Sequence, residues 1–372
     1  MAGEHRAGRD HAALSGRHRA RRGRARRGHR RRCRPLRRLL CAVTVLLVLG
    51  AAGAAAVAYR LDGNLRSVDI DSELGEDRPA PPDNGSMNVL VLGSDARSAK
   101  DDGSDGPARS DTAMVVHVYE GHRKAAIVSI PRDTLVTRPA CTTPGGGRDP
   151  GGPRRMFNES FSVGGPSCAV STVERMSGLR MDHYVEVDFT GFQKIIDSLG
   201  GVRLTTTAAV KDQSSHLDLP AGTHTLNGEQ ALALVRTRKS IGDGSDLGRI
   251  QLQQAFVKAL LNQVRGSGVL TSPTRLVALA DTATKAMTTD SALGSTTALI
   301  RFASGLTGLG AGGLQSLTLP VGPDAEDPNR VVPLASAAKA VWEALRTDQP
   351  VPQSATEKSL GDKGSAGSLL GQ

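Results

Sequence analysis

The sequence predicts a single mixed α/β domain, similar to an α-β-α sandwich, that follows one N-terminal transmembrane helix. Three observations lead to this prediction. Residues 39–59 form an uncharged apolar stretch. From residue 87 onward, short apolar runs typical of strands alternate with longer segments that carry helix caps. The middle of the chain, residues 86–350, is long enough to bury a sizeable core as one domain.

The N-terminal segment, residues 1–38, holds 15 arginines against Glu4 and Asp10, so it alone carries a charge of +13. Because the whole chain carries +10, the remainder sums to −3. A basic tail on a mildly acidic body is not the footprint of a nucleic-acid-binding domain. We therefore expect no nucleic-acid partner, and we interpret this segment as an Arg-rich cytoplasmic tail that also meets anionic lipid.

The apolar stretch "LLCAVTVLLVLGAAGAAAVAY", residues 39–59, would span about 31 Å as a helix, roughly one hydrocarbon core. The basic segment before it places the N-terminus in the cytoplasm and the chain after Arg60 outside. This predicts a single-pass protein of the cell membrane. A cleaved signal peptide is the alternative, since "AAGAAAVA" offers small residues to a peptidase, but the apolar run and the basic segment are long for one.

Two polar segments flank the expected domain. Residues 60–85 end in "DRPAPPDNG", which predicts a juxtamembrane linker. Residues 351–372 are rich in Ser, Gly and Lys, which predicts a disordered tail. The extracytoplasmic domain is therefore expected to occupy residues 86–350.

The first half of this domain predicts three strands. "MNVLVLGSD" (87–95) is a short apolar run closed by a glycine, typical of a buried strand. "TAMVVHVY" (112–119) and "KAAIVSI" (124–130) flank the turn "EGHR", which predicts an antiparallel hairpin. "SCAVSTVERMSG" (167–178) then predicts a helix that ends at its glycine.

The second half continues the alternation of strands and helices. A strand is predicted in "HYVEVDF", a helix in "GFQKIIDSLGG" and a strand in "VRLTT". Asn227 and Gln230 in "LNGEQALALV" form a capping-box pattern at the start of another helix. A longer helix follows over 247–264, then the strand "LQSLTL" and a closing helix around Trp342.

The four cysteines divide by compartment. Cys33 would lie in the cytoplasm and Cys41 in the membrane span, whereas Cys141 and Cys168 would lie outside, where an oxidised pair is expected. Such a bridge would stabilise the fold by about 3–4 kcal/mol through loop closure. Neither CxxC nor HExxH occurs in the sequence, which argues against a structural zinc or zincin site.

Charged residues flank the first three strands at one end. Asp95 follows the first strand, Asp111 precedes the second, and Arg132 follows the third. Because the second and third strands form a hairpin, we expect these three side chains to converge at one sheet edge. Two carboxylates brought together need a cation or arginines between them. Their hard oxygens suit Mg²⁺ (or Mn²⁺), which also binds substrate phosphates.

A second polar group lies in "ALVRTRKSIGDGSDLGRIQLQQ", residues 233–254. Arg236 and Arg238 are two residues apart, so in an extended segment they point to one side. Arg249 and Gln253 are four apart in a predicted helix, so they share a face. Planar guanidinium groups bind anion oxygens in bidentate fashion, so the two faces together indicate an anion site whose ligand these residues alone do not identify.

Each residue alone also has a plainer interpretation. Asp95 and Asp111 could simply form or cap turns, and the arginine pair could be a solvated edge. Arg249 and Gln253 could belong to a solvated helix face. Arg138 could be a further anion contact or a surface residue. The order and spacing of the whole set are more specific than any single member.

Seven segments carry this order: "NVLVLGSDAR", "RSDTAMVV", "VSIPRDTLV", "FNESFSVGGPSC", "HYVEVDFTGFQKIIDSLGGV", "LNGEQALALVRTR" and "DLGRIQLQQ". Together they resemble the LytR–CpsA–Psr family over about residues 87–345. The actinobacterial members are most similar, including their paired extracytoplasmic cysteines. The basic N-terminal segment and the single span also fit the topology of that family.

The resemblance implies a membrane-anchored phosphotransferase that takes a glycopolymer from a polyprenyl-pyrophosphate carrier and attaches it to peptidoglycan through a phosphodiester. It implies that Asp95 and Asp111 hold Mg²⁺ or assist proton removal. The pyrophosphate contacts that it implies are Arg132, Arg236, Arg238, Arg249, the neutral Gln253, and Arg109, which occupies the arginine position of "RSDT". Catalysis is then expected to depend on Asp95, Asp111, Arg132 and Arg236.

Two other functions use the same residues. A hydrolase would release polyprenyl phosphate with water as the acceptor. A non-catalytic polyprenyl-phosphate-binding module would regulate wall assembly. The two carboxylates favour catalysis, because a simple anion binder gains nothing from negative charge beside its ligand.

Overall fold

The computed structural model describes residues 33–95, 110–237, 246–357, 359 and 370–371. The chain divides into two compact units, residues 1–56 and residues 57–372. The described part of the first unit belongs to helix α1 (Cys33–Asp62), whose last residues enter the second unit. Residues 38–62 of α1 are long and apolar enough to cross a membrane, as the sequence predicts.

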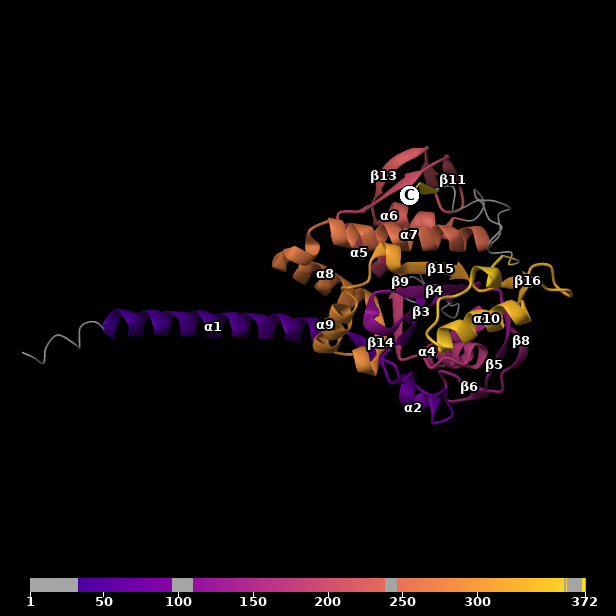
Figure 1. Ribbon diagram of the computed structural model, residues 1–372, viewed down its shortest axis with the longest axis horizontal. Helices are drawn as coiled ribbons and strands as arrows, with labels where there is room; N and C mark the ends of the chain where they lie inside the picture. The colour runs from indigo at the N-terminus through magenta and orange to yellow at the C-terminus, as the bar shows by residue number, and fades with distance from the viewer. Residues whose placement is uncertain (1–32, 96–109, 238–245, 358, 360–369, 372) are drawn as a thin grey trace, which may run out of the picture. The chain divides into compact units, whose positions relative to one another are not determined.

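The second unit is built around a seven-stranded sheet with the order β1-β14-β9-β2-β3-β4-β15 (Figure 1). β2, β3 and β4 are antiparallel neighbours, whereas β9 runs parallel to β2 and β15 runs parallel to β4. The predicted hairpin and the mixed α/β class are confirmed. The strands are β1 (Arg66–Val68), β14 (Met287–Asp290), β9 (His183–Asp188), β2 (Met87–Ser94), β3 (Ser110–Val118), β4 (Ala125–Ile130) and β15 (Leu314–Thr318).

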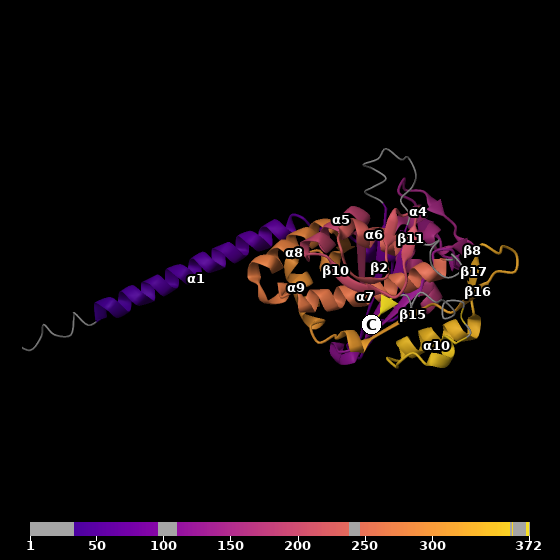
Figure 2. The same ribbon diagram turned by 90° about the horizontal axis from the view of Figure 1, so that it is seen from above.

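Both faces of this sheet are covered, because side chains alternate between two apolar clusters along each central strand. In β3, Ala113 and Val115 belong to one cluster, whereas Met114 and Val118 belong to the other. Helices α4 and α10 pack on the first face, and α5, α6 and α7 lie on the other side (Figure 1). Figure 2 shows α7 crossing in front of the sheet. The α-β-α arrangement follows.

The remaining helices and strands have these bounds. The α-helices are α2 (Ile70–Leu74), α4 (Phe157–Ser177), α5 (Phe189–Ser198), α6 (Gly228–Arg236), α7 (Asp246–Gly266), α8 (Pro273–Ala286), α9 (Thr296–Gly305) and α10 (Ala335–Arg346). The 3-10 helices are η1 (Glu120–His122), η2 (Val269–Thr271), η3 (Ser291–Leu293), η4 (Ala311–Gly313) and η5 (Gln353–Ala355). Smaller sheets contain β5 (Leu135–Arg138), β6 (Cys141–Thr142), β7 (Arg148–Asp149), β8 (Gly152–Met156), β10 (Val202–Thr206), β11 (Val210–Asp212), β12 (Leu217–Leu219), β13 (Gly222–Leu226), β16 (Val321–Pro323), β17 (Val331–Pro333) and β18 (Leu370–Gly371).

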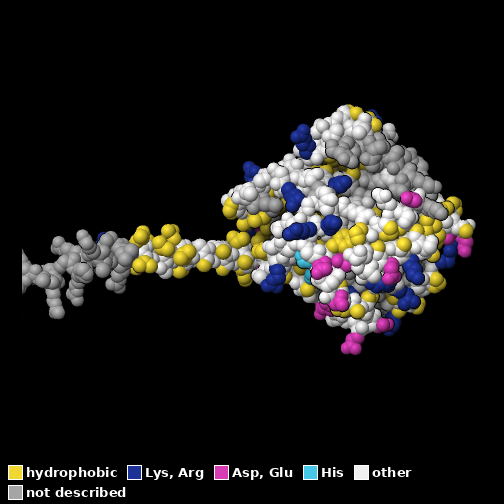
Figure 3. Space-filling view, viewed as in Figure 1, with side chains coloured by type: hydrophobic (Ala, Val, Ile, Leu, Met, Phe, Trp, Pro, Cys, Tyr) yellow, Lys and Arg dark blue, Asp and Glu magenta, His cyan; other side chains and the backbone are white. Residues whose placement is uncertain are grey.

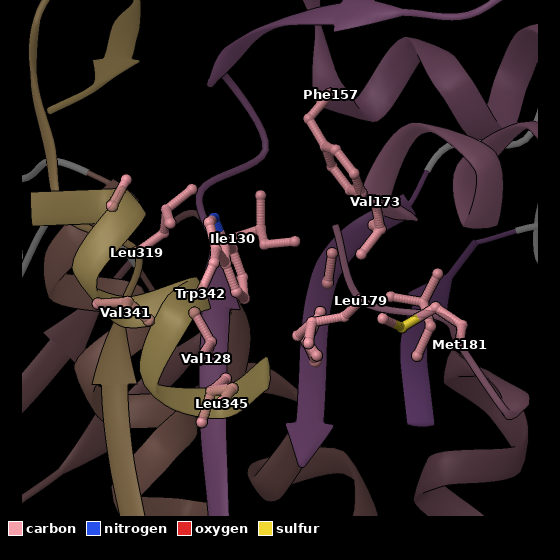
Figure 4. Close-up of a cluster of buried hydrophobic side chains, with 14 of the residues drawn as sticks. Val128, Ile130, Phe157, Val173, Leu179, Met181, Leu319, Val341, Trp342 and Leu345 are labelled. Carbon is pink, nitrogen blue, oxygen red and sulfur yellow. The ribbon is translucent and has the colours of Figure 1, made fainter. Parts of the chain in front are cut away.

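The core on the α4/α10 face is shown in Figure 4, where Val341, Trp342 and Leu345 of α10 lie against Val128 and Ile130 of β4. The spacing of the α10 residues, three and four apart, places them on one helix face. Trp342 is 5% exposed and is the only tryptophan of the chain. The predicted closing helix around it is therefore confirmed as a core element.

Helix α4 is longer than predicted. It begins at Phe157 rather than near Ser167, and it is kinked where Gly164 and Gly165 leave helical geometry. It ends at Gly178, which adopts the left-handed conformation (φ 68°) and donates its N–H to a helix carbonyl, as the predicted glycine stop requires. Glycine and proline residues usually end a helix, so the sequence pattern at the kink does not predict that one helix continues through it.

The predicted disulfide between Cys141 and Cys168 is present and joins β6 to α4 with a Cα–Cα distance of 5.5 Å. A side chain at Gly164 would lie 2.7 Å from the Cys168 Cβ atom and 2.9 Å from the Thr142 carbonyl oxygen. The kink glycine therefore lets the two segments approach closely enough to be bridged.

The segment 60–85 is more than the predicted linker. β1 pairs with β14 at the edge of the main sheet, Ile70 is buried, and Arg78 forms an ion pair with Glu174 of α4. The polar composition of the segment gave no sign of this edge strand. Such a strand is held by backbone hydrogen bonds and one anchoring side chain, so it needs no run of apolar residues.

The tail also departs from its prediction. Val351 and Ala355 are buried in the core, and Leu370–Gly371 pairs with Thr205 and Thr206 of β10. The disordered tail predicted for residues 351–372 is therefore wrong at these residues. The composition of the segment is dominated by small polar residues, which conceals its few apolar anchors.

Candidate active site at one edge of the central sheet

The site begins with a bulge between β2 and β3. Gly93 lies opposite Thr112 and Ser94 lies opposite Ser110, so Asp111 is the extra residue of the bulged strand. A bulge turns a side chain out of the regular alternation of the strand. A Cβ atom at Gly93 would lie 3.3 Å from the Cβ of Thr112, so glycine allows the strands to approach here.

Arg132 reaches Asp111 from the segment that follows β4. Its Nη1 atom donates to Oδ1 of Asp111 at 2.9 Å, and its Nε atom lies 3.4 Å from Oδ2 of Asp133. The Arg132 and Asp111 side chains are 22% and 24% exposed, so water reaches both. Asp95 directly follows β2 at the same end of the sheet. The structure confirms that Asp111 and Arg132 meet at this edge. The convergence of the Asp95 side chain with them and the chemical roles of all three residues stay predictions.

Helix α7 approaches the same bulge with two buried polar side chains. The Nη2 atom of Arg249 donates to the Asp111 carbonyl oxygen at 2.9 Å, and Nε2 of Gln253 donates to Thr112 Oγ1 at 3.1 Å. Arg249 is 3% exposed and Gln253 is 6% exposed. The two residues share a helix face, as predicted. This face of α7 lies against the sheet, so the alternative interpretation of a solvated helix face is wrong.

Arg236 enters the site from the end of α6. This helix begins with the predicted capping box of Asn227 and Gln230, and Arg236 is its last residue. Its guanidinium carbon lies 5.1 Å from the centre of the Phe189 ring, a cation–π distance. Arg236 therefore lies in a helix, and the extended segment considered for Arg236 and Arg238 is wrong at Arg236. Arg238 and Arg109 lie outside the described residues.

A buried carboxylate supports the end of β2. Ser94 donates its hydroxyl hydrogen to Oε1 of Glu186 at 2.5 Å, and the Tyr184 hydroxyl donates to Oε2 at 3.1 Å. Burial raises the pKa of Tyr184 well above its ordinary value, so the phenol stays a donor. Sequence reasoning missed Glu186. Its signal is a charged residue at a buried position of the alternating strand "HYVEVD".

Asp111, Arg236, Arg249 and Gln253 line a cleft of about 750 Å³ whose wall is drawn from β3, α5, α6, α7 and the β11–β12 turn, and Arg132 lies beside it through its bond to Asp111. Sequence reasoning also missed the part of its wall that comes from α5, the β11–β12 region and the start of α6. These positions carry no local motif, and only the packing of the second unit brings them here. The lining residues are Asp111, Thr112, Phe189, Gln193, Asp212, Ser214, Ser215, His216, Glu229, Leu232, Ala233, Val235, Arg236, Arg249 and Gln253.

Arg138 does not belong to this cleft. It is 4% exposed, its Nη2 atom donates to Oδ1 of Asp149 at 2.6 Å, and its Nη1 atom lies 3.7 Å from Glu159. The Gly151 N–H and Arg138 both bond the Asp149 carboxylate and hold its pKa below the ordinary value. Arg138 is therefore a buried structural residue rather than an anion contact or a surface residue.

The oxygen atoms at the site fit a magnesium ion. Within the described ranges, no three histidine, cysteine or acidic side chains form a metal-ligand cluster. Mg²⁺ does not require one, because it is usually bound by one or two carboxylates together with substrate phosphates and water. Asp95 and Asp111 supply two carboxylates at neighbouring strand ends, and Arg132 donates to Oδ1 of Asp111. The metal stays a prediction.

A family model described as the LytR_cpsA_psr family matches residues 57–347. The chain is 32% identical over 321 residues to the cell wall biosynthesis protein LcpA of Corynebacterium glutamicum, which covers 77% of this chain and 60% of that relative. It is 32% identical over 238 residues to the polyisoprenyl-teichoic acid–peptidoglycan teichoic acid transferase TagT of Bacillus subtilis, over 61% of this chain and 69% of that relative.

Solved structures share the fold. One described as "TagT bound to LI-WTA" has a TM-score of 0.54 and 27% identity, over 76% of this chain and 98% of that chain. The chain matches only 60% of the length of LcpA, so that relative is longer than the matched region. Together with the family model, these matches cover the strands and helices that build the cleft.

Proposed function

The chain belongs to the LytR–CpsA–Psr family, and from that premise we propose that it transfers a glycopolymer from a polyprenyl-pyrophosphate carrier to peptidoglycan, forming a phosphodiester. The names of its relatives, a teichoic acid transferase and a cell wall biosynthesis protein, support this proposal. The apolar part of α1 supports a single-pass anchor with the N-terminus in the cytoplasm and the site outside.

One observation carries the proposal: Asp111 is contacted by two arginines from different elements at the cleft. Arg132 bonds its carboxylate and Arg249 bonds its carbonyl oxygen. A simple anion site would place only positive groups here. A carboxylate held in place beside arginines instead suits a reaction in which a proton is removed while phosphate charge is neutralised.

The reaction balances with these groups alone. A hydroxyl oxygen of peptidoglycan forms a bond to the phosphorus that carries the glycan, and the bond from that phosphorus to the bridging pyrophosphate oxygen breaks. Polyprenyl phosphate leaves with the electron pair, and the hydroxyl proton passes to the carboxylate of Asp111 or Asp95. Phosphoryl transfer of this kind depends on positioning and charge neutralisation rather than on a covalent nucleophile.

The arginines bind the pyrophosphate in this scheme. Arg236 is exposed to the cleft and is oriented by Phe189, whereas Arg249 is fixed by its bond to the bulge. Gln253 is a neutral neighbour on the same helix face. When bound, Mg²⁺ held by Asp95 and Asp111 would neutralise further phosphate charge.

The test uses the full chain reconstituted in vesicles with a polyprenyl-pyrophosphate-linked glycan and peptidoglycan fragments, with Mg²⁺ or EDTA. Asp111→Asn is compared with Asp133→Asn, because both carboxylates contact Arg132 but Asp133 is not among the cleft residues. We expect a glycan–peptidoglycan phosphodiester from the native chain and from Asp133→Asn, and a loss of about 10²–10³-fold in Asp111→Asn.

Two outcomes contradict the proposal. Release of polyprenyl phosphate without any conjugate would indicate the hydrolase. Binding of the carrier without turnover, unchanged in Asp111→Asn, would indicate the non-catalytic binding module.

A further inference from the structure

Outside α1, the large apolar side chains that are exposed among the described residues lie on α8 and α9. They are Leu276 and Val277 of α8 and Ile300 of α9, at 43%, 40% and 61%. Neither helix belongs to the catalytic cleft. Both helices form hydrogen bonds with residues 58–64, so these exposed leucine, valine and isoleucine side chains are candidates for a shared contact surface.

Basic residues accompany these side chains. Arg275 precedes Leu276 and Arg301 follows Ile300, and both arginines are exposed. Residues 265–310 contain four basic and two acidic residues, whereas the chain from residue 39 onward carries a net charge of −3. Figure 3 shows hydrophobic and basic side chains next to each other over α8. The surface is therefore both apolar and positive on a domain that is otherwise acidic.

Both helices form hydrogen bonds with the residues that directly follow the apolar stretch. Arg60 and Asn64 bond Asp281 of α8 at 3.0 and 3.1 Å, and Asp62 accepts the backbone N–H of Thr296 in α9 at 2.5 Å. The apolar stretch ends at residue 59. From there to residue 62 a helix rises only about 4.5 Å. α8 and α9 are thus tied to the chain within a few residues of the proposed membrane span.

We propose that the membrane-facing patch, defined as Arg275, Leu276, Val277, Ile300 and Arg301, inserts its apolar side chains into the interface of an anionic lipid bilayer. The proposal rests on the membrane anchor of the proposed function. Apolar side chains bordered by arginines match the interfacial zone, where acyl chains meet negatively charged headgroups. The patch would fix the domain over the bilayer that holds its lipid-linked substrate.

A lipid surface fits the patch better than a protein partner does. A stable protein interface uses about 20–30 residues a side, whereas this patch has three apolar side chains and two arginines. Membrane binding needs no such area here, because the anchor keeps the patch at the bilayer and each inserted side chain adds to the attraction.

The first experiment measures contact with lipid directly. An environment-sensitive fluorophore is attached to Leu276→Cys or Ile300→Cys in the full chain, with Cys33 and Cys41 changed to Ser. Lys339→Cys, on an exposed position of α10, serves as the matched control. The chains are reconstituted in vesicles of phosphatidylglycerol and phosphatidylcholine that contain a nitroxide lipid. We expect strong quenching at 276 and 300 and little at 339.

The outcomes separate this inference from the proposed function. Equal quenching at all three positions, or none at 276 and 300 in chains that float with the vesicles, overturns the patch and leaves the transferase proposal intact. Chains that do not float with the vesicles overturn both the anchor and the patch.

A charge variant tests the lipid specificity. Arg275→Glu combined with Arg301→Glu should lower the quenching at Leu276→Cys in anionic vesicles but not in vesicles of phosphatidylcholine alone. We expect the surface attraction to fall by about fivefold or more for each arginine at low salt. In transfer assays this variant should raise the KM for a long-chain carrier in vesicles and leave a water-soluble short-chain carrier unaffected. An unchanged quenching signal contradicts the assignment to anionic lipid.

Discussion

Two clefts of nearly equal size lie on opposite faces of the central sheet, and their chemistry differs. The cleft that we propose to be catalytic lies between α5, α6 and α7 and encloses about 750 Å³, and the second cleft between α4 and α10 encloses about 730 Å³. The second is floored by Trp342 and Met176 and bordered by Arg154 and Arg346. Both therefore combine arginines with apolar walls, and volume does not distinguish them.

The partners of the arginines distinguish the two clefts. In the second cleft, Arg154 binds both oxygens of Asp324 at 3.0 and 2.9 Å, and Arg346 is paired with Glu343. In the catalytic cleft, Arg132 and Arg249 converge from different elements on the single residue Asp111. In the second cleft each arginine is bonded to a different carboxylate, whereas Arg132 bonds the Asp111 carboxylate and Arg249 bonds the Asp111 backbone carbonyl oxygen, so two guanidinium groups meet at one residue that lines the other cleft.

The largest effect should come from Arg236→Ala compared with Arg346→Ala, one arginine from each cleft. Loss of an arginine that stabilises phosphate charge lowers kcat by about 10³-fold or more. Arg346→Ala removes only an exposed ion pair, so we expect transfer within about twofold of the native rate. Steady-state transfer rates measure both. Similar losses in the two variants would contradict the distinction between the clefts.

Trp342→Ala should destabilise the domain at the second cleft without abolishing transfer activity. Removing a buried aromatic side chain lowers the free energy of unfolding by about 3–4 kcal/mol. Lys339→Ala, on an exposed position of the same helix, should change it by less than about 0.5 kcal/mol. Urea unfolding followed by circular dichroism measures both, because the variant lacks the only tryptophan. If the Trp342→Ala protein had native stability, the Trp342 side chain beside the second cleft would not contribute to the core.

The double variant Cys141→Ser, Cys168→Ser should lower the free energy of unfolding by about 2–4 kcal/mol, because the bridge closes a loop between residues 27 apart. Urea unfolding with and without reductant checks this, since the native chain should approach the variant when reduced. Transfer at low temperature should persist, because neither cysteine lines the catalytic cleft. Identical unfolding curves for the oxidised native chain and the variant would contradict this prediction.

The smallest effect concerns the pH dependence of the second cleft. Hydrogen bonds from Arg154 lower the pKa of Asp324 from 3.8 to about 2. A lowered folded-state pKa means that this contribution to stability is complete above about pH 4 and is lost as the pH falls through about 2. The Tm difference between the native chain and Arg154→Met should therefore narrow between pH 5 and pH 2. A constant difference would show that the pair does not titrate with folding.

Much of the fold was predictable because its signals are local. The strand "MNVLVLGS", the hairpin around "EGHR" and the capping box at Asn227 each depend on residues within one short window. The meeting of Asp111 and Arg132 was also predictable, since hairpin geometry brings the start of β3 and the end of β4 together. By contrast, the strand β1 and the buried Val351 belong to polar segments, where pattern alone indicates linker and tail.

By itself, the sequence determined the α/β class, the apolar span, the disulfide and the end of the sheet at which Asp95 and Asp111 lie. Only the tertiary structure decided which arginines reach that edge. Arg249 and Asp111 are 138 residues apart, and their contact depends on a one-residue bulge and on the packing of α7. The proposed patch likewise combines residues from α8 and α9, two helices that both form hydrogen bonds with residues 58–64. Contacts between distant segments depend on register and packing, which no short stretch of sequence contains.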